Sequence, residues 1–252
     1  MYIRKYKVQH KLAIGERFRS LCEIENCIDI KDIKNNEHSL IYSNGFGLNK
    51  DELNHIEKHT NFISSNQKSG FISKEYTKDN NHPTHKHRDE NILVKHLFQK
   101  GNEEYTADLC LDGRNEFLLD HVNGVHIPGL VFIEATRQIA MSIFHIYVQP
   151  DEDDVYFVLN EISSSYLGFA FPIDTKAQAH LALICEKTNQ YLITISFSQN
   201  DKTIVHSKAA FTIHEKKRFS LFEKKSAQKA IKKQIGTYKN QHQEKEVINA
   251  ER

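Results

Sequence analysis

The chain has 252 residues, enough for one large domain or for one compact domain with extensions. Its composition, 39% apolar and 27% charged, is that of a globular protein, while the mean hydropathy of -0.58 indicates polar segments outside the packed core. The formal net charge of only +1 excludes a global field that would attract nucleic acid or an anionic membrane. We therefore expect neither partner.

The cysteines and the apolar segments predict a cytoplasmic protein. Four cysteines are widely scattered and form no CxxC pair, which is typical of a reducing compartment: Cys22, Cys27, Cys110 and Cys185. The first twenty residues lack the continuous apolar region of a secretory signal. No segment approaches the roughly 18 apolar residues of a transmembrane helix.

Residues 1–75 are expected to form an N-terminal extension or a degenerate half. Leu21–Ile33 and His38–Tyr42 hold short strand-like or mixed runs, and Asn49–Asn61 has a helical pattern. Gly70–Asp89 is polar, rich in Lys, Asn and His, and contains Pro83, so it predicts a loop or linker at a domain boundary.

The strand pattern becomes clear after this linker. Ile92–Phe98 and Glu104–Leu111 predict a hairpin with its turn at Gly101-Asn102, and the second strand places alternate apolar residues on one face. Four more runs rich in β-branched and aromatic residues follow, with turns at residues 187–189 and 200–202: Val155–Ile162, Ala177–Cys185, Tyr191–Ser198 and Thr203–Ile213.

A long helix is expected between the two groups of strands. Pro128 and Gly129 open an apolar run, Leu130–Val148, with no breaker inside and Pro150 after it, and Pro suits a first helical turn. The run is apolar around most of its circumference, so the helix must be wrapped by other elements. One such helix and about six strands predict an α+β fold, a curled antiparallel sheet around one long central helix, which is the hot-dog architecture.

Polar residues form a narrow stripe on this apolar helix. Glu134, Gln138, Ser142 and His145 recur at nearly whole helical turns, with Arg137 on the flank. Burying such groups without partners is costly, so they either satisfy one another and lock the helix or face a ligand channel. The sequence leaves both readings open.

The loop before the helix brings two histidines to the helix start. His121 and His126 follow Asp120 and precede Pro128-Gly129, where unpaired backbone N–H groups can polarise a carbonyl oxygen. Glu134, if half-buried with a raised pKa, could share general acid and base work with a histidine on an acyl thioester. The alternative is hydrogen bonding of the histidines within a turn.

These residues resemble a known family. The run HVNGVHIPGLVFIEATRQ (His121–Gln138) resembles the signature of the A-factor biosynthesis (AfsA-like) hot-dog family, and HKHRDENILV (His85–Val94) resembles its leading segment. The run is more distantly similar to the pattern of the fatty-acid 3-hydroxyacyl dehydratases, although counting back from Glu134 at their spacing reaches Asp120. The resemblance covers about residues 84–214, expected as the hot-dog domain, with one visible repeat where family members of known type carry two.

The resemblance implies an acyltransferase that moves a 3-oxoacyl group from acyl carrier protein, or acyl-CoA, to the hydroxyl of a phosphorylated triose, as in γ-butyrolactone biosynthesis. Carried over to this chain, His126, Glu134 and His121 are the expected catalytic residues. Three further positions on the helix are expected to bind substrate, namely Gly129, Arg137 and Gln138. The alternatives are a non-catalytic acyl-binding or structural module, and a hydroxyacyl-thioester dehydratase.

Basic residues and the remaining polar clusters complete the expectations. Arg137, His85, Lys86 and Arg88 are expected to hold a phosphate of the acceptor or of a carrier arm. The histidines at 82, 85 and 87 lie in a loop without cysteine, so we expect no metal and no cofactor. Residues 215–252 are expected to form a basic helical tail with a solvated face. A homodimer is expected, because a second copy can continue the sheet across its open edge.

Overall fold

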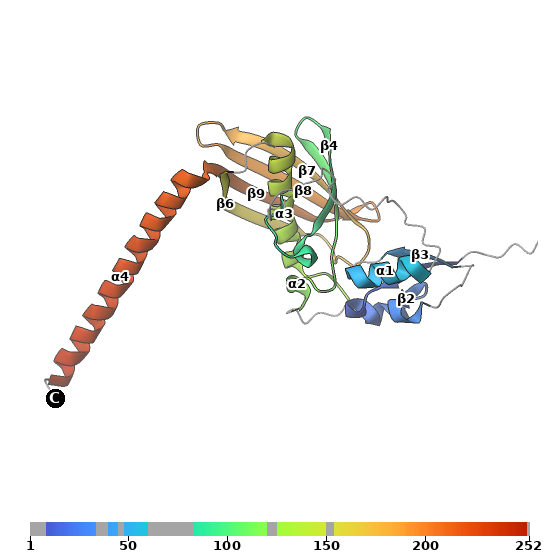
Figure 1. Ribbon diagram of the computed structural model, residues 1–252, viewed down its shortest axis with the longest axis horizontal. Coiled ribbons are helices and arrows are strands. Elements are labelled where there is room, and N and C mark those ends of the chain that lie inside the picture. The colour runs from blue at the N-terminus through green and yellow to red at the C-terminus, as the bar shows by residue number, and fades with distance from the viewer. Residues whose placement is uncertain are drawn as a thin grey trace, which may run out of the picture.

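The computed structural model describes residues 9–33, 40–44, 48–59, 83–119, 125–149 and 154–250 (Figure 1). These residues form a small N-terminal unit, a six-stranded sheet around a helix, and a long C-terminal helix. The expected linker at Gly70–Asp89 lies outside the described residues as far as residue 82.

The N-terminal unit is a three-stranded parallel sheet in the order β2-β1-β3. Its elements are β1 (Gln9–Ile14), η1 (Glu16–Glu23), β2 (Cys27–Asp29), η2 (Ile30–Asp32), β3 (Leu40–Asn44) and α1 (Lys50–His59). Ile30, Leu48 and Ile56 belong to a separate small core, while Phe18 and Leu21 join the core of the larger sheet. Because the parallel pairing differs from that of the larger sheet, we propose that this unit is an extension and not a second hot-dog half.

The larger sheet is antiparallel, with the order β4-β5-β7-β8-β9-β6. Its strands are β4 (Val94–Gly101), β5 (Glu104–Leu109), β6 (Val155–Tyr166), β7 (Thr175–Cys185), β8 (Gln190–Gln199) and β9 (Lys202–Glu215). The expected hairpin of β4 and β5 is confirmed, with its turn one residue later than predicted, because Gly101 still pairs with Glu104. Between β8 and β9, Asn200 and Asp201 both adopt positive φ, as a tight two-residue hairpin turn requires.

Helix α3 (Gly129–Ile143) lies against the inner face of this sheet and continues as one π-helical turn, η4 (Phe144–Val148) (Figure 1). Pro128 is the residue before the helix and not its first turn. Phe132, Ile139 and Phe144 are fully buried, together with the inward side chains of β5, β8 and β9. This is the hot-dog fold expected from the sequence. Two short elements accompany it: η3 (Asp89–Asn91) and α2 (Glu116–Leu119).

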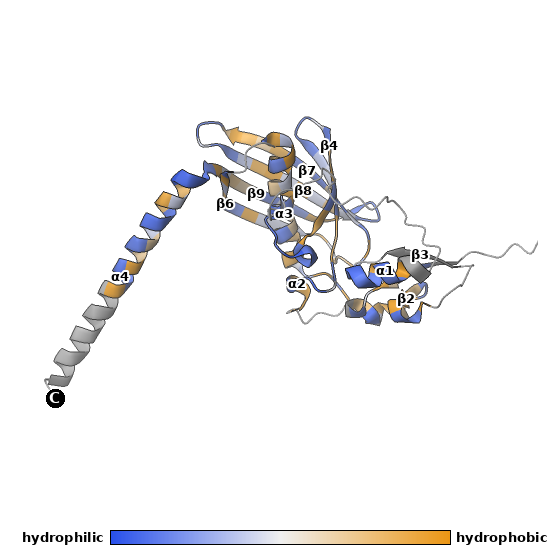
Figure 2. Ribbon diagram, in the orientation of Figure 1, coloured by the Kyte–Doolittle hydropathy of each residue, from blue (hydrophilic) through white to orange (hydrophobic). Residues whose placement is uncertain are grey.

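Helix α4 (Lys216–Ala250) leaves the domain after β9 and extends away from it (Figure 1). Its first turns pack on the body through Phe219, whose ring stacks on those of Tyr156 and His214 at 4.7 and 4.9 Å. Hydrophilic residues predominate along its described side chains (Figure 2). In the described part of the chain, no helix has the length and apolar character needed to cross a membrane.

Candidate functional site

Glu134 on α3 is held by three side chains. Arg137, one turn further along the helix, donates from Nε and an Nη atom to the two carboxylate oxygens at 2.9 and 2.7 Å. Gln138 donates to Oε1 at 3.0 Å, and Lys86 from the leading segment lies 2.9 Å from the same oxygen. Only 12% of the Glu134 side chain is exposed. Glu134 therefore has partners of its own, whereas the buried hydroxyl of Ser142, on the same stripe, has no hydrogen-bond partner among the described residues.

These partners keep Glu134 ionised. Burial alone raises the pKa of this carboxyl group, but the hydrogen bonds from Arg137, Gln138 and Lys86 outweigh burial and lower its pKa from 4.5 to about 2. The expectation of a raised pKa was wrong, because it counted burial and not the donors that accompany it. At neutral pH Glu134 has no proton to donate and is a weak base.

Gln138 ties α3 to the leading segment. Its side chain is fully buried; Nε2 donates to the Asn91 carbonyl at 2.9 Å, and Oε1 accepts from the Leu93 backbone N–H at 2.8 Å. Arg137 adds a bond to the Thr84 carbonyl at 3.3 Å. The two sequence segments that resemble the family, 85–94 and 121–138, are thus bound to each other through the stripe.

A mid-helix cavity of about 420 Å³ lies between α3 and the β6 and β9 strands. The rest of its wall is mostly apolar and aromatic, and four basic side chains line it: His85, His87, Arg137 and Lys216. His85 shares a hydrogen bond of 3.0 Å with the Nε2 of His145 on η4. Partial burial, followed by the nearby charges of His145 and Arg137, lowers the pKa of His85 to about 4, so this ring is neutral at pH 7. The cavity suits a ligand with an apolar part and an anionic group.

A helix-start cavity of about 480 Å³ lies at the first turn of α3. His126 lines it together with Gly129 and the apolar segment that follows β6, and the His126 and Phe169 rings are 5.4 Å apart. Leu167 and Phe169 are 56% and 71% exposed, so the cavity has an open apolar rim. No side chain caps the helix here, and the first N–H groups of a helix have no partner within it. These groups and His126 can together receive a carbonyl oxygen.

Gly129 is required by its neighbour at this cavity. A Cβ atom at this position would lie 2.9 Å from the ring and hydroxyl of Tyr166, closer than real Cβ contacts. The Tyr166 hydroxyl donates to the Gly129 carbonyl at 2.9 Å. Glycine therefore lets the end of β6 close over the start of α3.

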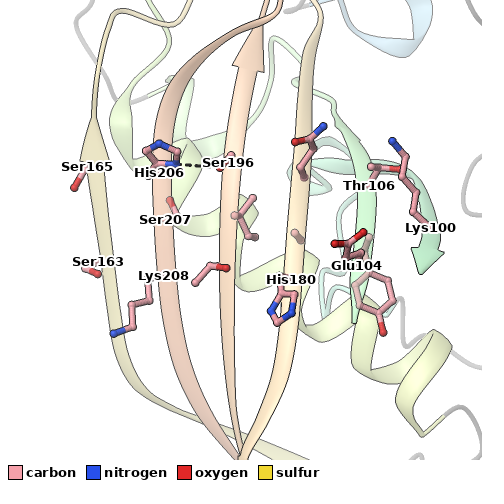
Figure 3. Close-up of a pocket in the computed structure, with 15 residues that line it drawn as sticks. Lys100, Glu104, Thr106, Ser163, Ser165, His180, Ser196, His206, Ser207 and Lys208 are labelled. Atoms are coloured by element: carbon pink, nitrogen blue, oxygen red, sulfur yellow. Dashed lines mark hydrogen bonds between the residues drawn. The ribbon is translucent and has the colours of Figure 1, made fainter. Parts of the chain in front are cut away.

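A third hollow, of about 720 Å³, lies on the outer face of the sheet (Figure 3). Lysines, histidines and hydroxyl groups line it, and the Ser196 hydroxyl and His206 Nδ1 are 3.0 Å apart. His206 and Lys208 are exposed and alternate with the buried Val205 and Ala209, as expected for a solvated sheet face. Polar side chains predominate in its lining, although Tyr105, Ala179 and Ile195 also belong to it.

The structure separates several residues that the sequence grouped together. His126 and Gly129 line the helix-start cavity, whereas His85 and Arg137 line the mid-helix cavity, and Glu134 lines neither. Arg88 is exposed and pairs with Glu116 at 2.8 Å, away from both cavities. His121 and Asp120 lie outside the described residues.

The histidine cluster is not supported as a metal site, and some residues at the two cavities were not predicted from the sequence. Among the described residues, no three His, Cys, Asp or Glu side chains gather as a metal site would require. Tyr166 and Phe169 were missed, because nothing in the run after residue 162 shows that the chain returns to the start of the helix. The contact between His85 and His145 was also missed, since 60 residues separate them.

Comparison with known proteins gives one family and a set of distant structures. The model of the A-factor biosynthesis hotdog domain matches residues 74–213, more than half of the chain. No curated protein matches this chain. Among solved structures, a mutant thioesterase from Pseudomonas aeruginosa shares 15% identity over 48% of this chain and 81% of its own, with a TM-score of 0.37. Thioesterases from Haemophilus influenzae and Staphylococcus aureus share 13% and 9%, over 49% and 47% of this chain and 79% and 91% of theirs, with TM-scores of 0.35 and 0.37.

Proposed function

We propose that this chain handles acyl thioesters, because it belongs to the A-factor biosynthesis hotdog domain family. In the proposed reaction it transfers a 3-oxoacyl group to the hydroxyl of a phosphorylated triose. The observation that carries the proposal is the helix-start cavity, where His126 and the uncapped first turn of α3 meet an apolar wall. Acyl carrier protein or acyl-CoA is the donor. No metal or other cofactor is needed for this transfer.

The reaction needs one base and one site for the developing oxyanion. His126 takes the proton from the acceptor hydroxyl, whose oxygen attacks the thioester carbonyl carbon. The backbone N–H groups at the start of α3, beginning with that of Gly129, stabilise the negative charge on the carbonyl oxygen. The C–S bond then breaks, and the leaving thiolate takes the proton from His126, which yields an ester and a free thiol. His121 is the alternative base.

Arg137 and His85 are the proposed phosphate contacts in the mid-helix cavity, with Lys216 beside them. Glu134 acts there as a positioning residue, because its ionised carboxylate fixes the guanidinium of Arg137 and the ammonium of Lys86. Gln138 supports the same arrangement through the backbone and not through substrate. Arg88 is withdrawn from the phosphate site, since its partner is Glu116.

A homodimer completes the proposed site. β6 is a twelve-residue strand at the edge of the sheet, and the exposed Leu167 and Phe169 follow directly after it. A second copy pairing along β6 would satisfy the edge and cover the open rim beside His126. Sedimentation should show one species near twice 29.3 kDa at micromolar concentration. A monomer with full turnover would contradict the shared rim.

The test of the reaction compares three outcomes with one set of substrates. The protein is mixed with 3-oxoacyl carrier protein or 3-oxoacyl-CoA and dihydroxyacetone phosphate, and thiol release and product mass are followed. Thiol release with an ester product supports the transferase. Binding of the thioester without thiol release indicates the non-catalytic acyl-binding module, and loss of water from a 3-hydroxyacyl thioester indicates the dehydratase.

A further inference from the structure

Helix α4 concentrates positive charge on one face. Between Lys216 and Lys239 the chain has nine Lys or Arg residues and one acidic residue, Glu223. At 3.6 residues per turn, four of them fall within an arc of about 60°. This basic face consists of Arg218, Lys225, Lys229 and Lys232, all of them exposed.

The basic face is unfavourable for a helix that stands alone. Lys225 and Lys229 are at i,i+4 spacing, where like charges repel, and Glu223 is the one acidic residue between Lys216 and Lys239. The described contacts with the body are made by the first turns, through Phe219 and through Glu223, which accepts from the Tyr156 hydroxyl at 3.5 Å. An anionic partner along the face would remove this repulsion.

The helix begins at the rim of the mid-helix cavity. Lys216, its first residue, lines that cavity, and so does Tyr156, whose ring stacks on Phe219. A partner lying along α4 is therefore brought to the opening that also contains Arg137. The residues matched by the family model end at 213, so α4 lies beyond the matched residues.

One extended ligand could occupy both cavities. Both have α3 on one side and β6 and β9 on the other. Gly129 in one and Arg137 in the other are eight residues apart on α3, or about 12 Å along the helix axis. A phosphate held by Arg137 and Lys216 would leave a long, flexible arm to reach His126.

From these observations we infer that α4 is the docking helix for an acidic acyl carrier protein, whose phosphate-linked arm enters at the mid-helix cavity and presents its thioester at the helix-start cavity. This inference rests on the proposed function. An acidic protein fits better than a membrane, because the exposed large apolar residues of α4 are spread around the helix and form no continuous apolar face: Leu221, Phe222, Ile231 and Ile235.

The test reverses the face and leaves both cavities intact. Lys225→Glu, Lys229→Glu and Lys232→Glu are combined in the full-length protein. The matched control reverses three exposed lysines at turns and ends of the sheet, Lys100→Glu, Lys187→Glu and Lys202→Glu. Circular dichroism checks that both variants keep their helix content.

Binding of an acylated, negatively charged acyl carrier protein of type II fatty-acid synthesis is measured by calorimetry at low and high salt. We expect the dissociation constant to rise about tenfold or more in the α4 variant, to stay unchanged in the control, and to rise with salt in the native protein. The Michaelis constant for the same acyl group on free pantetheine should not change. An equal response of carrier and pantetheine substrates would overturn the docking role.

The remaining outcomes separate the docking inference from the proposed function. Carrier binding that depends on α4, with no thiol ever released, leaves the docking helix in place and removes the transferase. Thiol release from carrier substrate that is equal in native protein and α4 variant keeps the transferase and overturns the docking. Binding of anionic phospholipid vesicles through α4, without any carrier binding, also overturns it.

Discussion

Replacing Glu134 by glutamine should destabilise the fold more than it impairs the chemistry. The carboxylate has Arg137, Gln138 and Lys86 as donors, and their combined effect lowers its pKa from 4.5 to about 2. A difference of that size corresponds to about 3 kcal/mol of folding free energy at neutral pH. The amide keeps the shape but turns a donor toward Arg137 or Lys86 and leaves their charges without a counterion.

The same pKa sets the pH dependence of the loss. Because the folded-state pKa of Glu134 lies below its unfolded value of 4.5, its contribution is complete above about pH 4.5 and disappears as the pH falls toward about 2. Urea unfolding at pH 7 and at several lower pH values should show a gap between native protein and Glu134→Gln that closes on acidification. Glu116→Gln is the control, since its pair with Arg88 is exposed and should contribute about 0.5 kcal/mol or less.

Two results would refute this reasoning. A Glu134→Gln variant of unchanged stability and abolished turnover would place the carboxylate in the chemistry as an acid or base. A stability loss that persisted unchanged at low pH would show that packing, and not charge, is what the substitution damages.

Three further predictions concern the two cavities. His126→Asn should lower kcat by about a hundredfold or more while the dissociation constant for an acyl thioester stays within about twofold, as measured by steady-state kinetics and calorimetry; equal turnover would remove His126 as the base. Gly129→Ala should reduce turnover because its Cβ meets the Tyr166 ring, and Gly129→Ala with Tyr166→Ala should recover part of it, whereas an unaffected single variant would show that the ring moves freely. Arg137→Lys should raise the Michaelis constant for an acyl group on phosphopantetheine and not for the same group on pantetheine, and an equal rise for both would restrict Arg137 to the helix network.

The sheet and its helix could be predicted because their periodicities are clear. The buried face of β5 is indicated by the alternation of Tyr105, Ala107 and Leu109, and the burial of α3 is indicated by the apolar run after Gly129. β6 extends four residues past the predicted end, since the run Ser163 to Ser165 lacks the β-branched residues that mark strands. The parallel pairing of β1 with β2 and β3 could not be predicted, because strands of three to six residues carry no signal of their partner.

The chemistry of the polar stripe was harder to predict than its position. Helical spacing places Glu134 and Gln138 on one face, but it says nothing of the segment that reaches them. Lys86 lies far from Glu134 in sequence, and its hydrogen bond adds to those of Arg137 and Gln138, which together lower the pKa of Glu134. Likewise, spacing cannot show that Arg137 and His126 open onto different cavities, since that depends on where β6 begins and ends.

The amide of Gln138 has a consequence for how this chain reaches its fold. Its Nε2 donates to the Asn91 carbonyl and its Oε1 accepts from the Leu93 N–H, as the backbone N–H and C=O of a neighbouring strand would do. These contacts span 45 and 47 residues, so they close a long loop and can form only after α3 is helical and has approached the sheet. The segment before β4 is therefore expected to become fixed late in folding and to be released early in unfolding. The contacts of Gln138 thus help to set how long the native state persists before it unfolds.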